Sequence, residues 1–241
     1  MFYLTLFKVI TKKSRITRKT SYKLGKKPKI TIVDTGSANL HSVFKACKKV
    51  GANVCISSSE KDLRKSDGVI VPGVGSIDAV IKTLIEKKLD APMWSLMEQG
   101  HKFLTICLGM QMLFNSSDEG NLSGLGFVPG NVKHFTKTMV EDSQTILKVP
   151  HIGWNSVTFK PIEGKEHQHP IFKGIPNNTY FYFLHSYYCV PKYEKDYAAT
   201  TNYGIEFCSA VAKNNVIGTQ FHPEKSGEAG LMIYENFIQY T

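Results

Sequence analysis

The chain has 241 residues, of which 42% are hydrophobic and 11% aromatic, enough for one sizeable globular domain and too many for a small disulfide-held scaffold. Its formal net charge of +10 would suggest nucleic-acid binding, but ten of its 30 basic residues precede Ile30, and no acidic residue precedes Asp34. The other 20 basic residues balance 20 acidic ones, so the excess belongs to an N-terminal arm, and a DNA-binding fold loses most of its support.

The arm, residues 1–28, begins apolar and then becomes Lys-rich, which reverses the order of a secretory signal. A transit peptide remains open; a disordered extension or an upstream start codon is the favoured interpretation. No uncharged apolar run approaches the ~18–20 residues that span a bilayer. The five cysteines are an odd number without CxxC spacing, so we expect a reducing, cytoplasmic compartment and neither a metal nor a cofactor.

From Lys29 onward, β-branched runs alternate with helical periodicity, which predicts an α/β fold with a mostly parallel central sheet flanked by helices. The expected strands of the first half are Lys29–Val33, Asn53–Ile56, Gly68–Val71 and Lys102–Ile106. The expected helices there cover residues 40–50, with Asn39 as a possible cap, 77–89 and 108–114.

Beyond about Leu125 the pattern predicts mostly additional strands and a terminal helix. The strands include Tyr180–Leu184, Ala198–Asn202, Ser209–Lys213 and Val216–Phe221, and the helix covers about Glu228–Tyr240. The sequence shows no internal repeat and no low-complexity linker. Residues 29–241 are therefore interpreted as one domain.

Cys107 stands between an apolar strand and a helix, followed by Leu108 and Gly109, which is the context of a nucleophile elbow. A sharp turn there exposes the thiol at a helix N-terminus, where free N–H groups favour the thiolate form. The N–H of Leu108 would then face a developing oxyanion. A lone cysteine is more often a small buried hydrophobe, but the preceding strand and the glycine argue for the elbow.

A thiolate needs a proton shuttle, and that base needs a partner that orients it. His222 follows a predicted strand, and Pro223 fixes the turn so that His222 and Glu224 lie on the same side. Alone, this tripeptide is as consistent with an ordinary turn at a strand end. Together with the elbow, it makes a Cys107–His222–Glu224 triad plausible.

These residues resemble the class I (triad-type) glutamine amidotransferases, from about Ile30 to Tyr240. Six segments in order resemble, within the class, the glutaminase subunits of imidazole glycerol phosphate synthases. They are residues 34–40 (DTGSANL), 72–75 (PGVG), 107–111 (CLGMQ), 150–155 (PHIGWN), 185–187 (HSY) and 220–226 (QFHPEKS). Six motifs in order are a very specific signal.

The resemblance implies that glutamine is hydrolysed to glutamate and ammonia through a thioester on Cys107, with His222 moving protons and Glu224 orienting His222. It implies an oxyanion hole made by Leu108 and the Val74–Gly75 peptide, which reorients before the site is active; glycine makes such a reorientation easy. It assigns glutamine binding to Gly75, Gln111, Glu119, Ser186 and Tyr187. Solvated or packing roles were the alternatives for Gln111, Glu119 and Tyr187.

The resemblance also implies a heterodimer in which a separate (β/α)₈-barrel cyclase subunit receives the ammonia and makes imidazole glycerol phosphate and aminoimidazole carboxamide ribotide in histidine biosynthesis. Such a barrel needs ~200 residues or more. The expected partner interface is the segment with Pro150, His151, Trp154 and Asn155. Core packing is the alternative for Trp154.

One departure is Thr105, which stands where the family's elbow usually has glycine, so a side chain is expected to crowd the turn. Three other functions remain open at this point. They are a paralogue that supplies ammonia for surface-polysaccharide sugars, a non-enzymatic interaction protein whose arm binds polyanions, and a cysteine hydrolase acting on peptides.

Overall fold

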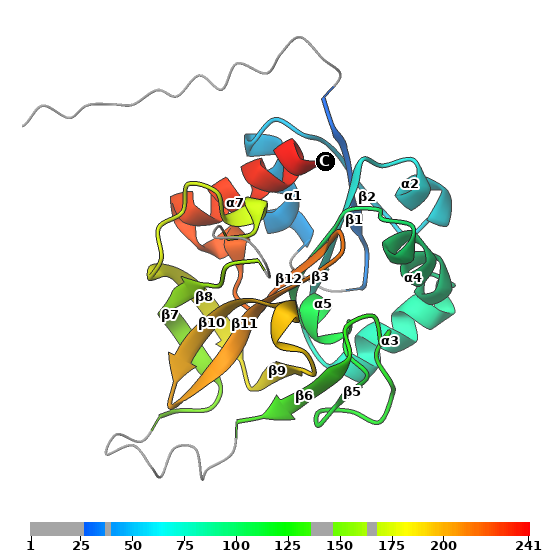
Figure 1. The fold of residues 1–241 in the computed structure, drawn as a ribbon. Coiled ribbons are helices and arrows are strands. Elements are labelled where there is room, and N and C mark those ends of the chain that lie inside the picture. The colour runs from blue at the N-terminus through cyan, green and yellow to red at the C-terminus, as the bar shows by residue number, and fades with distance from the viewer. Residues whose placement is uncertain (1–26, 37–39, 136–146, 163–167) are drawn as a thin grey trace, which may run out of the picture.

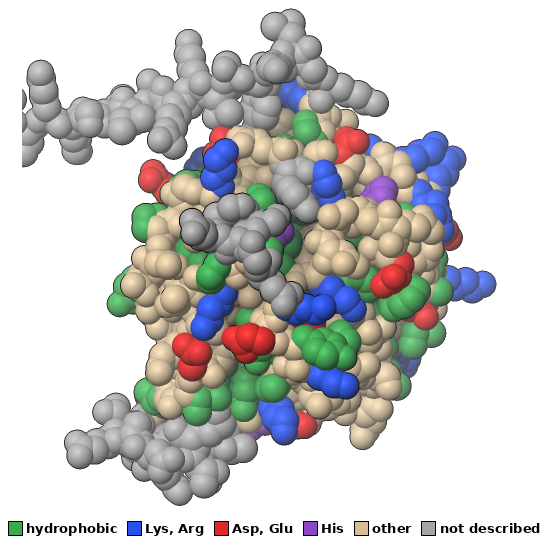
Figure 2. All heavy atoms as spheres, in the orientation of Figure 1, with side chains coloured by type: hydrophobic (Ala, Val, Ile, Leu, Met, Phe, Trp, Pro, Cys, Tyr) green, Lys and Arg blue, Asp and Glu red, His purple; other side chains and the backbone are tan. Residues whose placement is uncertain are grey.

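The computed structural model describes residues 27–36, 40–135, 147–162 and 168–241. The expected basic arm therefore lies outside the described residues except for Lys27 and Pro28, and so does the expected cap Asn39. Basic and acidic side chains are interspersed on the described surface in Figure 2, which fits a body of balanced charge. Among the described residues, no helix is long and apolar enough to cross a membrane.

One 12-stranded mixed sheet forms the centre of the described fold, with its main strands in the order β2-β1-β3-β4-β12-β11-β10-β7-β8 (Figure 1). The first five strands in this order are parallel to one another. They are β1 (Lys29–Val33), β2 (Asn53–Ser57), β3 (Gly68–Gly73), β4 (Phe103–Cys107) and β12 (Val216–Thr219). The parallel part, with the carboxyl ends of β3 and β4 side by side, is where sheets of this kind bind ligands.

Helices cover both faces of the parallel strands, as in Figure 1. Apolar side chains of α1 and α7 pack in one core cluster, and those of α3 and α4 pack in the other. The helices are α1 (Leu40–Lys49), α2 (Glu60–Arg64), α3 (Ile77–Glu86), α4 (Asp90–Glu98), α5 (Leu108–Gln111) and α7 (Gly227–Tyr240). Burial on both faces explains the nearly continuous apolar runs of β3 and β4.

Antiparallel strands extend the sheet beyond β12. They are β11 (Ile205–Lys213), β10 (Tyr197–Tyr203), β7 (His151–Phe159) and β8 (Thr179–His185), while β5 (Ser116–Ser117), β6 (Gly130–His134) and β9 (Tyr187–Pro191) lie beside them. Strands β7 and β8 pair over their length, from His151 opposite His185 to Val157 opposite Thr179. Their alternation places one row of side chains inward and one outward.

The expected helix over residues 77–89 is wrong at its C-terminal end, because it stops at Glu86. Lys88 has a left-handed backbone with φ of 53°, which ends the helix, and α4 then begins at Asp90. The expected helix 108–114 is also shorter, since regular α5 ends at Gln111 and tighter turns follow, with Leu113 N–H bonded to the Met110 carbonyl. Strand β12 ends at Thr219, before the expected Phe221.

Candidate active site

A cavity of about 270 Å³ opens at the carboxyl ends of β3 and β4. It brings together segments that are far apart in the sequence. Its lining is Val74, Gly75, Cys107, Leu108, Gln111, Glu119, Pro150, Leu184, His185, Ser186, Tyr187 and His222. Every residue expected to bind glutamine or form the oxyanion hole therefore lies around one cavity.

The elbow is held by close packing between β3 and α5. Cys107 has φ of 55° and ψ of −111°, an uncommon conformation for a residue with a side chain. Gly109 lies so close to β3 that a Cβ atom there would be 2.1 Å from the Val71 carbonyl oxygen. The chain thus turns sharply at Cys107 because the next turn rests directly on the neighbouring backbone.

Thr105 does not crowd this turn, contrary to the sequence expectation. It lies inside β4 opposite Gly218 of β12, and its hydroxyl donates to the Ile217 carbonyl at 3.3 Å. A Cβ at Gly218 would be 3.0 Å from the Thr105 oxygen. The missing side chain at Gly218 therefore makes the room that Thr105 occupies.

His222 and Glu224 lie on the same side of the turn that Pro223 begins, a short 3₁₀ helix over Pro223–Lys225. The Glu224 Oε1 is 2.8 Å from His222 Nδ1, and both side chains are only 1% exposed. A carboxylate at that distance accepts a hydrogen bond from Nδ1–H. This bond leaves Nε2 for the Cys107 sulfur, and a hydrogen bond to that sulfur is one of the causes that raise the pKa of His222.

Two neighbouring groups raise the pKa of His222. Burial by itself lowers the pKa of His222, but the Cys107 sulfur and the Glu224 carboxylate together raise this pKa to about 10. His222 is therefore held as an imidazolium beside the Cys107 sulfur. Such a pair supplies both a nucleophile and an acid for a leaving amine.

Ser226 fastens this turn to strand β8. Its hydroxyl donates to the His222 carbonyl at 2.7 Å and accepts from the Tyr182 N–H at 3.0 Å. The His222 N–H in turn donates to the Tyr182 carbonyl at 2.9 Å. The position of His222 is therefore fixed against the hairpin of β7 and β8, which the sequence pattern alone does not reveal.

The remaining cavity residues have different surroundings. Gly75 is exposed with φ of +102°, and a Cβ there would meet nothing within 4 Å. Glu119 accepts from the Ile77 N–H at the start of α3 at 3.0 Å, and burial, followed by the nearby Asp78 charge, raises the pKa of Glu119. Gln111 donates to the Tyr187 carbonyl at 3.2 Å. The cavity thus combines one carboxylate, a fixed amide and an open glycine peptide.

The segment expected at a partner interface divides between two sides of β7. Trp154 is 56% exposed, whereas the His151 side chain is buried and stacks between Phe183 and Tyr203. Pro150 lines the cavity itself. Only part of this segment can meet a partner, because the side chains of a strand alternate.

Gln220 is a buried residue to which the sequence analysis assigned no role, although it begins the segment 220–226. Its amide lies between Gln111 and Cys107, and its side chain is fully buried. His151 was expected at the partner interface and His185 stands in a recognised segment, but neither ring was expected to contact the other. Only the three-dimensional arrangement shows that these polar groups face one another.

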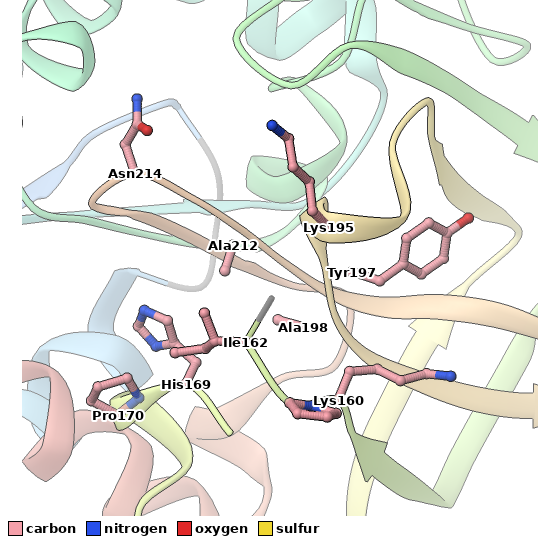
Figure 3. Close-up of a pocket in the computed structure, with 10 residues that line it drawn as sticks. Lys160, Ile162, His169, Pro170, Lys195, Tyr197, Ala198, Ala212 and Asn214 are labelled. Carbon is pink, nitrogen blue, oxygen red and sulfur yellow. The ribbon is translucent and has the colours of Figure 1, made fainter. Parts of the chain in front are cut away.

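A second cavity of about 320 Å³ lies near β10 and β11 (Figure 3). The figure labels Lys160, His169, Lys195 and Tyr197 in its lining, with apolar residues between them. Among the described residues that line it, none is a cysteine or a carboxylate. Nucleophilic chemistry is therefore assigned to the cavity that contains Cys107.

A family model for class I glutamine amidotransferases matches residues 31–240. One relative, the imidazole glycerol phosphate synthase subunit HisH of Gloeobacter violaceus, is 39% identical over 217 residues, which cover 90% of this chain and 91% of that protein. The same subunit of Methanosarcina acetivorans is 42% identical over 214 residues, which cover 88% and 98%.

Solved structures show the same fold at low sequence identity. PurLQS from Thermotoga maritima has a TM-score of 0.67 at 16% identity, covering 89% of this chain and 99% of that one. A glutamine amidotransferase from the same organism has a TM-score of 0.58 at 14% identity, covering 85% and 80%. The chain therefore belongs to the class I glutamine amidotransferases, in the group of the imidazole glycerol phosphate synthase subunit HisH.

Proposed function

We propose that this chain hydrolyses glutamine to glutamate and ammonia and supplies the ammonia to an imidazole glycerol phosphate synthase. The observation that carries this proposal is a thiol and a carboxylate-bound imidazole at one cavity, Cys107 with His222 and Glu224. Relatives named as subunits of that synthase cover almost the whole body of the chain. This favours it over the paralogue, the interaction protein and the peptide hydrolase.

The reaction begins when the Cys107 thiolate attacks the side-chain carbonyl carbon of glutamine. The oxyanion that forms is stabilised by the N–H of Leu108, which the short helix α5 leaves without an intrahelical partner, and by the Val74–Gly75 peptide. His222 protonates the departing amine, so ammonia leaves and a thioester remains on Cys107. Water then attacks the thioester carbonyl carbon while His222 removes its proton, and cleavage of the carbon–sulfur bond releases glutamate and the thiolate.

Substrate binding is assigned to groups of opposite character in the lining of the cavity. Glu119 is the carboxylate there, and it suits the α-ammonium group of glutamine. Backbone groups of the segment with Ser186 and Tyr187 suit the α-carboxylate. Gln111 and the open peptide at Gly75 complete this set. The positive φ of Gly75 is one that glycine adopts without steric cost, so this peptide can change orientation when glutamine binds.

The ammonia acceptor is a (β/α)₈-barrel cyclase subunit that docks as a heterodimer partner on the outer face of the β7–β8 hairpin. We define this hairpin face by its exposed side chains, Ile152 (57%), Trp154 (56%), Tyr180 (60%) and Leu184 (38%). Exposed aromatic and aliphatic side chains gathered on one sheet face are typical of an interface. The face lies close to the cavity, since the Cys107 thiol donates to the Leu184 carbonyl at 3.8 Å.

Glutamate release from glutamine, measured with the cognate cyclase subunit and its nucleotide ligand, tests the proposal. The wild-type chain is expected to turn over glutamine when all components are present, and Cys107→Ala is expected to be inactive. Cys55→Ala is the matched control, because Cys55 is a partly exposed free cysteine on β2 outside the cavity lining. Its activity should equal that of the wild type.

Turnover that persists in Cys107→Ala would refute the proposed chemistry. Turnover with a sugar-modifying amidotransferase partner, but not with the cyclase, would transfer the chain to the paralogous function. Peptide cleavage that glutamine does not inhibit would support the peptide hydrolase instead. These outcomes differ in their substrates, so one set of assays distinguishes them.

A further inference from the structure

Gln220 lies at the reacting sulfur, although no role has been assigned to it. It follows β12 and is fully buried, and its Nε2 is 3.7 Å from the Cys107 Sγ. Buried amides in cores keep their hydrogen-bond partners, so the direction of this contact matters. Its main-chain N–H is separately fixed to the Ser209 carbonyl at 2.9 Å.

The orientation of the Gln220 amide follows from a carbonyl oxygen that can only accept. The Tyr187 carbonyl accepts from Gln111 Nε2 at 3.2 Å, and this fixes which end of the Gln111 amide faces it. The same nitrogen donates its second hydrogen to Gln220 Oε1 at 3.2 Å. Since Oε1 of Gln220 is engaged in this way, its NH₂ group must face the sulfur.

The Tyr187 carbonyl is itself held from its other side. His185 Nδ1 donates to it at 2.8 Å, and His185 Nε2 is 3.0 Å from His151 Nδ1. Burial lowers the pKa of His185 to about 3 and that of His151 to about 4. Both rings are therefore neutral near pH 7, and each donates through Nδ1–H and accepts at Nε2. Asn155 ends this series of hydrogen bonds, because its amide nitrogen is 3.3 Å from His151 Nε2.

We propose that Gln220 donates a hydrogen bond to the thiolate of Cys107, and that Gln111 and the Tyr187 carbonyl hold its amide in that direction. The sulfur then has, besides His222, a hydrogen-bond partner for each of its protonation states. As a thiol it donates to the Leu184 carbonyl at 3.8 Å, and as a thiolate it accepts from Gln220. Hydrogen bonds to the charged form favour that form. This inference rests on the proposed role of Cys107 as the nucleophile.

Alkylation of Cys107 by iodoacetamide tests this without glutamine or a partner. The rate is followed from pH 5 to 10 by mass spectrometry of the Cys107 peptide in the full chain. Gln220→Glu keeps the shape and the acceptor for Gln111, but it presents oxygen to the sulfur. The midpoint of its rate–pH curve is expected to rise by about one unit, so that alkylation below the wild-type midpoint is about tenfold slower. Gln99→Glu at an exposed helix end is the control and should match wild type.

The titratable groups near the sulfur also influence this curve, and their identity is unchanged in the variants. They are His222 with Glu224, His185, Cys189 and, across the cavity, Glu119. Gln220→Met removes the donor without adding charge and should slow alkylation below the wild-type midpoint about threefold. It decides the question if Gln220→Glu does not fold. A wild-type curve for Gln220→Met would overturn the proposal, because a rise confined to Gln220→Glu would then reflect charge repulsion alone.

Glutamine turnover separates this inference from the proposed function. With the partner present, Gln220→Glu should lower kcat about tenfold and leave KM nearly unchanged, because its bond to Gln111 is kept. A rise in KM at constant kcat would overturn the proposal in favour of a substrate-binding role for Gln220. If the variants show the expected changes in alkylation but the wild-type chain never hydrolyses glutamine, the proposed function is refuted and the inferred hydrogen bond from Gln220 to Cys107 still holds.

Discussion

The elbow at Cys107 and the β7–β8 hairpin have opposite relations to their surroundings. At the elbow, a Cβ on Gly109 would be 2.1 Å from the neighbouring backbone, so the turn has no spare space. On the hairpin face, Trp154 and Tyr180 are more than half exposed. Chemistry that needs fixed geometry occupies the tightly packed region, while recognition of another chain needs accessible apolar surface.

The hairpin nevertheless has a hidden side that faces the cavity. Its inward row includes His151 and His185, which reach the Tyr187 carbonyl and through it Gln111. Trp154 on the outer row is next to Asn155 and three residues from the buried His151. One strand pair thus presents a docking surface outward and positions polar groups of the active site inward.

The largest expected effect is the destabilisation of the folded state in Gly109→Ala. The added Cβ would overlap the Val71 carbonyl, which is backbone of a central strand, so either β3 or the elbow must move. The free energy of unfolding should fall by more than about 3 kcal/mol, measured by urea denaturation. Gly153→Ala on the hairpin is the matched control.

Gly153 has φ of +136°, but a Cβ there would meet nothing within 4 Å. Its substitution should cost only the strain of that backbone, about 1–2 kcal/mol. The comparison between elbow and hairpin would fail if Gly153→Ala were as destabilising as Gly109→Ala. In that case backbone conformation, and not packing, would limit both regions.

The next largest expected effect is the loss of glutamine turnover in Glu224→Gln. The amide keeps the shape of the side chain but no longer stabilises a charged His222, so glutamine turnover should fall about 10³-fold or more while the fold is kept. Glu60→Gln is the control, since Glu60 forms its ion pair with Arg64 on an exposed helix. A loss in both variants, or in neither, would contradict the role of Glu224.

The parallel half of the sheet was predicted well from the sequence. Strand β1 was predicted with its observed bounds, because its β-branched run ends where the chain must turn. Helix α4 was not predicted, and the helix before it, α3, was predicted to end too late. Apolar residues continue across Lys88, and the hydrophobic pattern does not show that the backbone of Lys88 is left-handed. Such a break depends on packing of the two helices that it separates.

The triad of Cys107, His222 and Glu224 was predicted as a set, whereas Gln220 was given no role. Cys107 and His222 stand at strand ends, which local patterns mark, but the direction of the Gln220 amide depends on Gln111 and Tyr187 from distant segments. Thr105 was expected to disturb the turn for a similar reason. Thr105 fits because it lies opposite Gly218 of β12, and the sequence near Thr105 does not show how β4 and β12 are aligned.

A smaller effect is expected in the pH dependence of stability, on the hidden side of the hairpin. Burial lowers the pKa of His151 to about 4 and that of His185 to about 3, both below the ordinary value of 6.5. The unfolded chain therefore binds more protons below pH 6.5, and stability is lost as pH falls from about 6.5 toward 3.

Urea denaturation between pH 7 and 5 should reveal this loss, and His151→Asn should reduce it, because asparagine keeps a donor for His185 but does not take up a proton. His41→Asn on the exposed side of α1 is the control and should retain the wild-type slope. An unchanged slope in His151→Asn would show that this imidazole is not kept neutral by the fold.

The smallest effect on the isolated chain is expected on the hairpin face, in Trp154→Ala. Its indole is 56% exposed, so the free energy of unfolding should change by no more than about 0.5 kcal/mol. Affinity for the cyclase subunit, measured by calorimetry, should nevertheless fall about 10- to 100-fold, since a large aromatic side chain in an interface contributes about 1–3 kcal/mol. The matched control is Trp94→Ala, which removes the other tryptophan, 44% exposed on α4. Equal losses of affinity in the two variants would place the partner over α4 as well, and the proposed division between a packed catalytic region and an open docking face would then be wrong.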